Sequence, residues 1–254
     1  MKIIKSIIVA FSMYSRIPMP RFEWESEDMK YHLIFFPWIG AVIALVQYLW
    51  FLFSNYFETA HIVFALIVAT IPLIITGGFH LDGYMDVSDA LYSYQNKERR
   101  HEILKDPHIG AFSVIKICIY GLLLLASIYS MDDRGFLAWI FMFFIVRAVS
   151  GICVIRYKKA KGEGLLNTEA KTADDRLVIF FLALQLVLAA VIAGALFQYK
   201  LTVCLLALLI SVIYYRYISY SKFGGVTGDL AGWFVCNAEL LSAIFVALFT
   251  IISK

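Results

Sequence analysis

The chain has 254 residues, of which 61% are hydrophobic and 16% aromatic, while only 16% are charged. A soluble domain usually carries about 25% charged residues, and disordered, collagenous or coiled-coil chains need a polar bias or a strict repeat that this sequence lacks. The formal net charge of +3 gives no basis for binding nucleic acid. We therefore predict an all-α, polytopic integral membrane protein whose surroundings are the lipid bilayer.

Seven apolar runs are long enough to cross a bilayer, because a spanning helix needs roughly 20 mostly apolar residues. We expect spans at residues 31–53, 61–79, 109–130, 135–155, 177–197, 201–220 and 230–252. A shorter apolar stretch at residues 1–14 is interrupted by Lys5 and soon followed by Arg16 and two prolines. It is too short to span, and we expect it to lie at the membrane interface rather than to be a cleaved signal peptide.

The distribution of Lys and Arg predicts the orientation in the membrane. Most of the 22 basic residues lie in the N-terminal segment and in the second, fourth and sixth loops, whereas the opposite side has only Arg134, Lys200 and Lys254. Loops rich in Lys and Arg stay on the cytoplasmic side. We therefore expect a cytoplasmic N-terminus, an external C-terminus and an active site at the cytoplasmic face.

No internal repeat and no Pro/Gly/Ser-rich linker divides the chain, which favours a single membrane-embedded domain over residues 1–254. Residues 1–30 form its cytoplasmic or interfacial N-terminal segment. The loops expected to carry the chemistry are residues 80–108, 156–176 and 221–229.

Three aspartates directly follow the second apolar run. Asp82, Asp86 and Asp89 are spaced i, i+4, i+7, so they share one face of a helix. Because such like charges repel and hard oxygen ligands suit Mg²⁺ or Mn²⁺, the pattern predicts a metal site, which Asp106 would join if the loop folds back. A solvated acidic loop is the alternative, although apolar residues occupy the complementary helical positions. Neighbouring His80 is expected to form hydrogen bonds rather than to bind the metal.

Basic residues follow the acidic group, at Arg99, Arg100, Lys105 and His108. Phosphoryl transfer depends mainly on positioning and on electrostatic stabilisation of the phosphoryl oxygens. A diphosphate substrate would therefore use both the metal and these cations. The alternative is that the basic residues only keep the loop on the cytoplasmic side.

Two further loops contain glycines beside polar residues. Glycines before a helix let backbone N–H groups approach phosphate, and the helix N-terminus adds partial positive charge. The candidates in the sixth loop are Gly225, Thr227, Gly228 and Asp229; the alternative is a flexible turn capped by Asp229. In the fourth loop, Lys161 and Glu163 form a similar charged stretch or a plain connector.

Arg147 and Glu239 lie inside expected spans, roughly 13 to 15 Å below the cytoplasmic ends of their helices at 1.5 Å per residue. A charge in lipid is costly and usually faces a polar interior. The two residues either pair to hold two helices together or line the floor of a polar cavity beneath the loops. We predict the cavity, with both side chains contacting substrate.

The sequence from Gly77 through Asp82, Asp86 and Asp89, continued by residues 99–112, closely resembles the cobalamin synthase family, the adenosylcobinamide-GDP ribazoletransferases. That family has a pattern of roughly GGxHxDGxxDxxDG followed by RxxIMKDxxIGxxG. Supporting matches to other family motifs occur at residues 16–20, 36–40, 161–165 and 225–232. The resemblance therefore reaches from residue 16 to about residue 240.

The chain departs from the family pattern at three places. Ala90 replaces the usual Gly after the third Asp, and Lys161 with Gly162 replaces the arginine-proline before Glu163. Cys236 stands where the family has a Glu. These changes leave the acidic group whole and alter the fourth and sixth loops.

The resemblance implies a transferase that joins adenosylcobinamide-GDP to the hydroxyl of alpha-ribazole or its 5'-phosphate and releases GMP. Mg²⁺ on the three aspartates would bridge the diphosphate, Lys105 and Arg100 would stabilise charge, and Asp106 or a cluster carboxylate would accept the hydroxyl proton. The implied substrate contacts are His80, Arg147, Lys161, Glu163, Gly225, Thr227, Gly228, Asp229 and Glu239. The expected location is the cytoplasmic membrane of a prokaryote, where the chain could associate with itself or with other enzymes of cobalamin synthesis.

Two other functions are compatible with parts of the pattern. A CDP-alcohol phosphotransferase would use the same metal chemistry, but Val87 and Ser88 stand where its alanine and arginine would be. A secondary transporter would also keep charges inside its spans, yet it is expected to have broken helices in two related halves. The charges here gather at one face instead.

Overall fold

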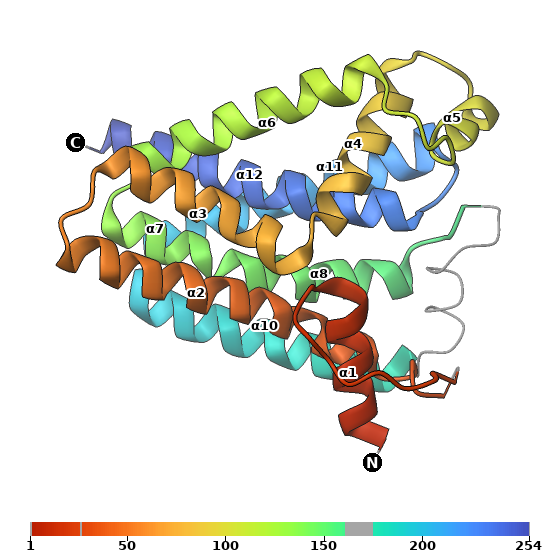
Figure 1. Cartoon of the computed structure of the whole chain (residues 1–254), viewed down its shortest axis with the longest axis horizontal. Coiled ribbons are helices and arrows are strands. Elements are labelled where there is room, and N and C mark those ends of the chain that lie inside the picture. The colour runs from red at the N-terminus through yellow and green to blue at the C-terminus, as the bar shows by residue number, and fades with distance from the viewer. Residues whose placement is uncertain (1, 26, 161–174, 254) are drawn as a thin grey trace.

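The computed structural model describes residues 2–25, 27–160 and 175–253, and these fold into helices without any strand (Figure 1). Only one isolated bridge, between Lys159 and Val226, has β geometry in this part of the chain. The all-α prediction is confirmed.

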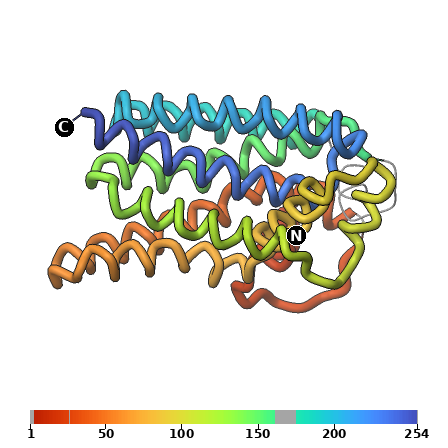
Figure 2. The backbone as a smooth tube through the Cα atoms, turned by 90° about the horizontal axis from the view of Figure 1, so that it is seen from above, coloured from red at the N-terminus to blue at the C-terminus, as the bar shows by residue number. Residues whose placement is uncertain are grey.

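The helices run back and forth side by side, as both views of the backbone show (Figures 1 and 2). Six are long and apolar enough to cross a membrane, when α7 and α8 are taken as one. The elements of the bundle are α2 (Phe36–Tyr56), α3 (His61–Thr76), α6 (Ala111–Ser130), α7 (Asp133–Ile140), α8 (Met142–Arg156), α10 (Asp175–Phe197), α11 (Tyr199–Lys222) and α12 (Gly228–Ile252). Large apolar side chains stay exposed on their outer faces, such as Leu122 and Val191, which is the pattern of a polytopic membrane protein.

The seventh candidate span is α3 together with α4 (Phe79–Tyr92), and the two meet at an angle of 96°. The bend is located at Gly77 and Gly78, whose φ angles are +65° and +79°. Glycine adopts this left-handed conformation at little cost because it has no Cβ. As a result α4 turns steeply away from α3 (Figure 1), and most of the segment expected to be a loop at residues 80–108 is helical, including α5 (Lys97–Ile103).

Glycines allow α4 to lie directly on α12. A Cβ at Gly83 would be 2.8 Å from the Cα of Asp229, and one at Gly232 would be 3.0 Å from the carbonyl oxygen of His80. Small residues at helix crossings bring backbones close in membrane proteins. This contact places the start of α12 against the acidic face of α4.

The N-terminal segment lies at the same end of the bundle as α4 and α5, and the C-terminus lies at the other end (Figures 1 and 2). Its helix α1 (Lys2–Tyr14) has 13 residues and packs against the short helix η1 (His32–Phe35). The backbone N–H of Arg16 donates to the carbonyl of Ile75 at 2.7 Å. This hydrogen bond ties the N-terminal segment to the end of α3.

Candidate functional site

The acidic face of α4 forms the centre of the site. Tyr84 and Val87 are buried on the opposite face, so this segment is a packed helix and not a loop. The carboxylates of Asp82, Asp229 and Asp89 all repel the charge on Asp86. The structure therefore groups Asp229, which the sequence placed only in a phosphate-binding loop, with the three aspartates of α4.

None of these four carboxylates forms an ion pair with a described residue; the ion pairs of the described segments involve other acids. No three described His, Cys, Asp or Glu side chains converge closely enough to enclose a metal ion by themselves. Mg²⁺ is commonly held by one or two carboxylates, waters and substrate phosphates. An acidic group without ion pairs can therefore supply the protein ligands of Mg²⁺, with water and substrate phosphate as the other ligands.

The chain after α5 returns to this acidic face at Gly110. A Cβ at Gly110 would collide with the carboxylate of Asp89, so glycine leaves room for that side chain in its present position. Glycine here allows the backbone before α6 to cover one side of the site.

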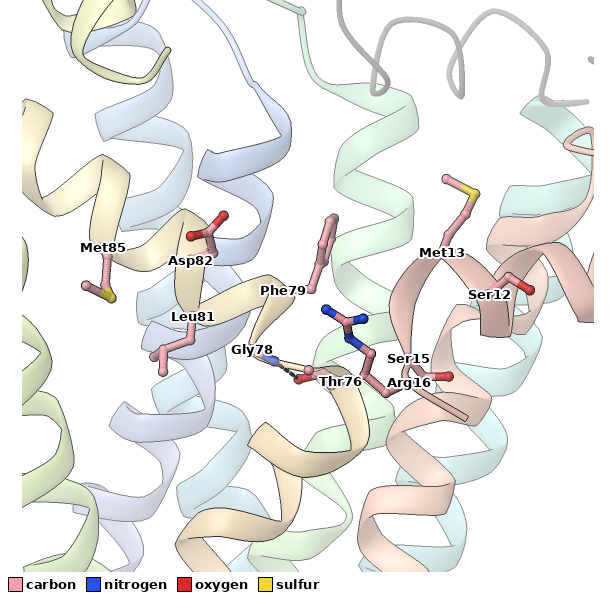
Figure 3. A pocket seen from close by; sticks show the side chains of 11 residues that line it. Ser12, Met13, Ser15, Arg16, Thr76, Gly78, Phe79, Leu81, Asp82 and Met85 are labelled. Atoms are coloured by element: carbon pink, nitrogen blue, oxygen red, sulfur yellow. Dashed lines mark hydrogen bonds between the residues drawn. The ribbon is translucent and has the colours of Figure 1, made fainter. Parts of the chain in front are cut away.

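A cavity of about 540 Å³ opens on the other side, between α1 and the start of α4 (Figure 3). It reaches from the N-terminal segment to Asp82. Its lining consists of Ser12, Met13, Ser15, Arg16, Thr76, Gly77, Gly78, Phe79, Leu81, Asp82 and Met85. Sequence reasoning used Arg16 only as part of a family motif and missed its place in this cavity.

Helix α5 packs on the C-terminal end of α11. Arg100 Nη1 donates to the carbonyl of Lys222 at 3.2 Å, and His101 Nε2 lies 2.8 Å from the carbonyl of Phe223. Free carbonyls at a helix C-terminus are stabilised by such basic groups. Arg100, predicted to act on the phosphoryl group, thus also fixes the beginning of the sixth loop.

Lys105 and Asp106 are exposed to solvent after α5. Asp106 Oδ1 accepts from the backbone N–H of His108 at 3.0 Å and lies 2.7 Å from its Nδ1. These hydrogen bonds, the backbone one first, lower the pKa of Asp106 below its ordinary value. A carboxylate with a lowered pKa is a weaker proton acceptor.

The sixth loop is a fixed turn. Val226 donates to the carbonyl of Lys158 at 2.9 Å, and Ala160 donates back to Val226 at 3.1 Å. The N-cap of α12 is Thr227, whose Oγ1 accepts from the N–H of Leu230 at 3.2 Å, and not Asp229 as the flexible-turn alternative supposed. Asp229 is therefore free to contribute its charge to the acidic group, while Gly228 is exposed.

The fourth-loop candidates Lys161 and Glu163 lie outside the described residues. Gly225, a candidate of the sixth loop, packs its backbone against that of Lys159 and Ala160. The described start of the fourth loop and the sixth loop therefore hold each other in place.

Arg147 and Glu239 form a buried ion pair, with Arg147 Nη1 2.6 Å from Glu239 Oε1 and 2.8 Å from the carbonyl of Phe143. The two residues are 1% and 5% exposed, and neither lines the cavity beside Asp82. The pairing considered from the sequence is thus present, and a substrate contact at these residues stays a prediction.

His80 is buried on the inner side of α4, with its ring 5.6 Å from that of Phe36. Its Nδ1 has no hydrogen-bond partner among the described residues. The hydrogen bond expected for His80 is therefore not made at this atom within the described chain.

Comparisons with known proteins identify the family of the chain. Residues 6–247 match the family described as cobalamin-5-phosphate synthase. The adenosylcobinamide-GDP ribazoletransferase of Lachnoclostridium phytofermentans is 41% identical over 98% of this chain and 95% of its own length. Proteins of the same name from Clostridium botulinum (strain Alaska E43) and Clostridium perfringens (strain SM101) are 30% and 31% identical over 97% and 96% of this chain, and each is covered over 98% of its length.

No solved structure matches the chain. The family match spans nearly all of the sequence, and the described helices include the acidic motif on which the resemblance depends. The chain belongs to the cobalamin-5-phosphate synthase family, the membrane-spanning transferases of cobalamin biosynthesis.

Proposed function

We propose that this chain transfers the adenosylcobinamide-phosphate part of adenosylcobinamide-GDP to alpha-ribazole or its 5'-phosphate, with release of GMP. The names of the relatives support the donor, and the family description supports the phosphorylated acceptor. The observation that carries the proposal is the unpaired acidic face of α4, placed within a chain that matches the family almost end to end.

The acidic residues fit a divalent cation, Mg²⁺ or Mn²⁺. Asp82, Asp86 and Asp89 would hold it, with Asp229 close enough to add its charge. Such a cation, when bound, neutralises a diphosphate and orients it. Without a cation, the four neighbouring carboxylates would repel that same diphosphate.

In the reaction, the acceptor hydroxyl oxygen attacks the phosphorus that carries cobinamide, and the bond from that phosphorus to the GMP oxygen breaks. Lys105 is exposed and stabilises the charge that develops on the phosphoryl oxygens. Arg100 holds the sixth loop beside α4 through Lys222. The hydroxyl proton passes to a carboxylate of the acidic group rather than to Asp106, whose pKa is lowered by His108.

The direct test is an assay of the purified chain in lipid vesicles with adenosylcobinamide-GDP and alpha-ribazole 5'-phosphate. We expect GMP and the joined corrinoid in equal amounts when Mg²⁺ is present, and neither product after removal of divalent metal with EDTA. Mn²⁺ should restore part of the activity. Absence of GMP under all of these conditions would contradict the proposed reaction.

We also propose that α4, α5 and the N-terminus face the cytoplasm, because Lys and Arg are concentrated at that end. In a variant without the native cysteines, Gln95→Cys should be protected from a membrane-impermeant thiol reagent in intact cells, whereas Ser253→Cys should react. Both positions are exposed to solvent in the structure. The opposite labelling pattern would place the site outside the cell.

A further inference from the structure

The cavity between α1 and α4 contains one cation and one acid among its lining residues, Arg16 and Asp82 (Figure 3). The other residues of its lining with polar side chains are Ser12, Ser15 and Thr76. Arg16 forms no ion pair with any described acid. Its positive charge therefore faces a volume of about 540 Å³ without a partner from the described chain.

The backbone around Arg16 is fixed in several ways. Its N–H donates to Ile75 at 2.7 Å, and Thr76 Oγ1 donates to the carbonyl of Pro72 at 2.8 Å while accepting from the N–H of Gly78 at 3.3 Å. The Arg16 side chain crosses Gly77 so closely that a Cβ there would collide with its Nε. The α3–α4 turn thus makes room for this guanidinium at the edge of the cavity.

We propose that this cavity binds the phosphate monoester of the acceptor, with Arg16 as the residue that recognises it. The proposal rests on the proposed function, in which the acceptor is alpha-ribazole 5'-phosphate. Arg16 is then a substrate-binding residue that distinguishes the phosphorylated acceptor from the free nucleoside.

Charge supports this assignment. A phosphate monoester is a dianion near neutral pH, and the four carboxylates of the acidic group repel it. A cation held by those carboxylates would be engaged by the donor diphosphate, so the acceptor phosphate would need a separate positive group. A guanidinium binds phosphate with two parallel hydrogen bonds, which suits this role.

Position supports it as well. The attacking hydroxyl and the 5'-phosphate belong to the same ribose, so the phosphate must lie within about one sugar of the reacting centre. The cavity meets this condition because Asp82 belongs both to its wall and to the acidic group. The start of α4, whose N-cap Gly78 makes no side-chain cap, belongs to the same wall and adds partial positive charge.

The test compares two acceptors in one assay. Arg16→Gln should raise the KM for alpha-ribazole 5'-phosphate about tenfold or more, which corresponds to roughly 1.4 kcal/mol. The KM for alpha-ribazole and that for adenosylcobinamide-GDP should change less than about twofold, and Arg16→Lys should recover part of the preference because it keeps the charge. The control is Arg134→Gln, which removes the same charge at an exposed position of α7 and lines neither this cavity nor the adjoining one that Arg16 shares with Arg21.

Several outcomes would overturn the assignment. An equal loss with both acceptors would make Arg16 a residue of general importance for the reaction, and a raised KM for adenosylcobinamide-GDP alone would give Arg16 to the donor diphosphate. Failure of both Arg16 variants to insert and fold would make it a structural residue. An unmodified chain that is inactive with either acceptor would instead refute the proposed function.

Discussion

The charged residues in the interior and at the far end of the bundle differ from the acidic group on α4 in having partners of opposite charge. In the interior, Arg147 is paired with Glu239 at 2.6 Å, and towards the opposite end Lys200 is paired with Asp132 at 2.9 Å. At the α4 end, the acidic group of Asp82 and its three neighbours has no described partner of opposite charge, and neither has Arg16.

We interpret the paired charges as stabilising the fold and the unpaired charges as binding a ligand. In a buried ion pair each charge is compensated by the other. Removing one partner leaves an uncompensated charge that destabilises the protein. Like charges held together without a partner cost free energy, and a bound cation recovers it. Mutations should therefore reduce stability in the interior and activity at the α4 end.

The largest expected effect on activity is at the acidic group. Asp82→Asn or Asp86→Asn keeps the side-chain shape but removes a charge that the metal needs, so we expect activity to fall by more than about a hundredfold, or several kcal/mol of transition-state stabilisation. The fold should be retained or slightly stabilised because repulsion decreases. The measurement is product formation together with the thermal unfolding midpoint.

Glu98→Gln is the matched control, since Glu98 is an exposed acid on α5 beyond the acidic face. It should leave activity nearly unchanged. Equally mild losses for all three variants would break the distinction between the two regions, because the acidic face would then be an ordinary solvated surface.

The next largest effect is expected at the interior pair. Arg147→Met alone leaves Glu239 charged and buried, which costs about 3 to 5 kcal/mol of stability. Adding Glu239→Leu removes the second charge and should restore the folded, inserted protein, and an active double variant would mean that the pair only holds the two helices together. Unfolding midpoints and product formation for both single variants and the double variant form the required cycle.

A double variant that is folded but inactive would give the pair a role beyond packing. It would support the substrate contact predicted from the sequence. Interior charges would then contribute to activity as well as to stability.

A third effect concerns the contact that joins the two regions. Gly83→Ala would put a Cβ 2.8 Å from both the Cα and the carbonyl oxygen of Asp229, and backbone atoms cannot move aside easily. We expect a loss of about 1 to 3 kcal/mol in stability and a loss of activity as Asp229 shifts from α4.

The control for this change is Gly121→Ala on α6, where nothing lies within 4 Å of the new Cβ. This variant should be neutral or more stable by about 0.5 to 1 kcal/mol, because alanine favours a helix. If both alanine variants behave alike, close packing of α4 on α12 does not position the site.

Much of this arrangement could be predicted from the sequence because the signals are local. Apolar run length predicts the spans, and the i, i+4, i+7 spacing predicts that Asp82, Asp86 and Asp89 share a helical face, which α4 confirms. The bend before α4 and the position of Asp229 were not predicted. Both depend on where Gly77, Gly78 and Gly83 let backbones turn or touch, and a single glycine has the same appearance in a turn, a crossing or a strand.

The contact between Arg147 and Glu239 also could not be predicted from the sequence. Sequence placed Arg147 and Glu239 at a similar depth, but two charges at one depth can face each other or a common cavity. Only the rotation of α8 against α12 distinguishes these cases. The structure shows that the two side chains face each other, 2.6 Å apart, and their contact with substrate stays a prediction.

The smallest expected effect is at Asp132, between α6 and α7. Burial alone would raise its pKa, but hydrogen bonds from Lys200 Nζ and from the N–H of Gly135 lower the pKa of Asp132 below its ordinary value. A depressed pKa means that this pair stabilises the fold above the unfolded pKa of about 3.9, and that the contribution disappears as the pH falls through the lower folded value.

Lys200 also contacts Thr250 Oγ1 at 3.0 Å, so the pair links α7, α11 and α12. Because the Asp132 side chain is 47% exposed, solvent screens the pair and its contribution should be below about 1 kcal/mol. We expect the unfolding midpoint of the unmodified chain to decrease below about pH 4 more than that of Asp132→Asn, which has no charge to lose. If Asp132→Asn has the same acid sensitivity as the unmodified chain, the Asp132–Lys200 pair does not stabilise the fold. The contrast between structural ion pairs and the unpaired acidic group of α4 would then not hold for this pair.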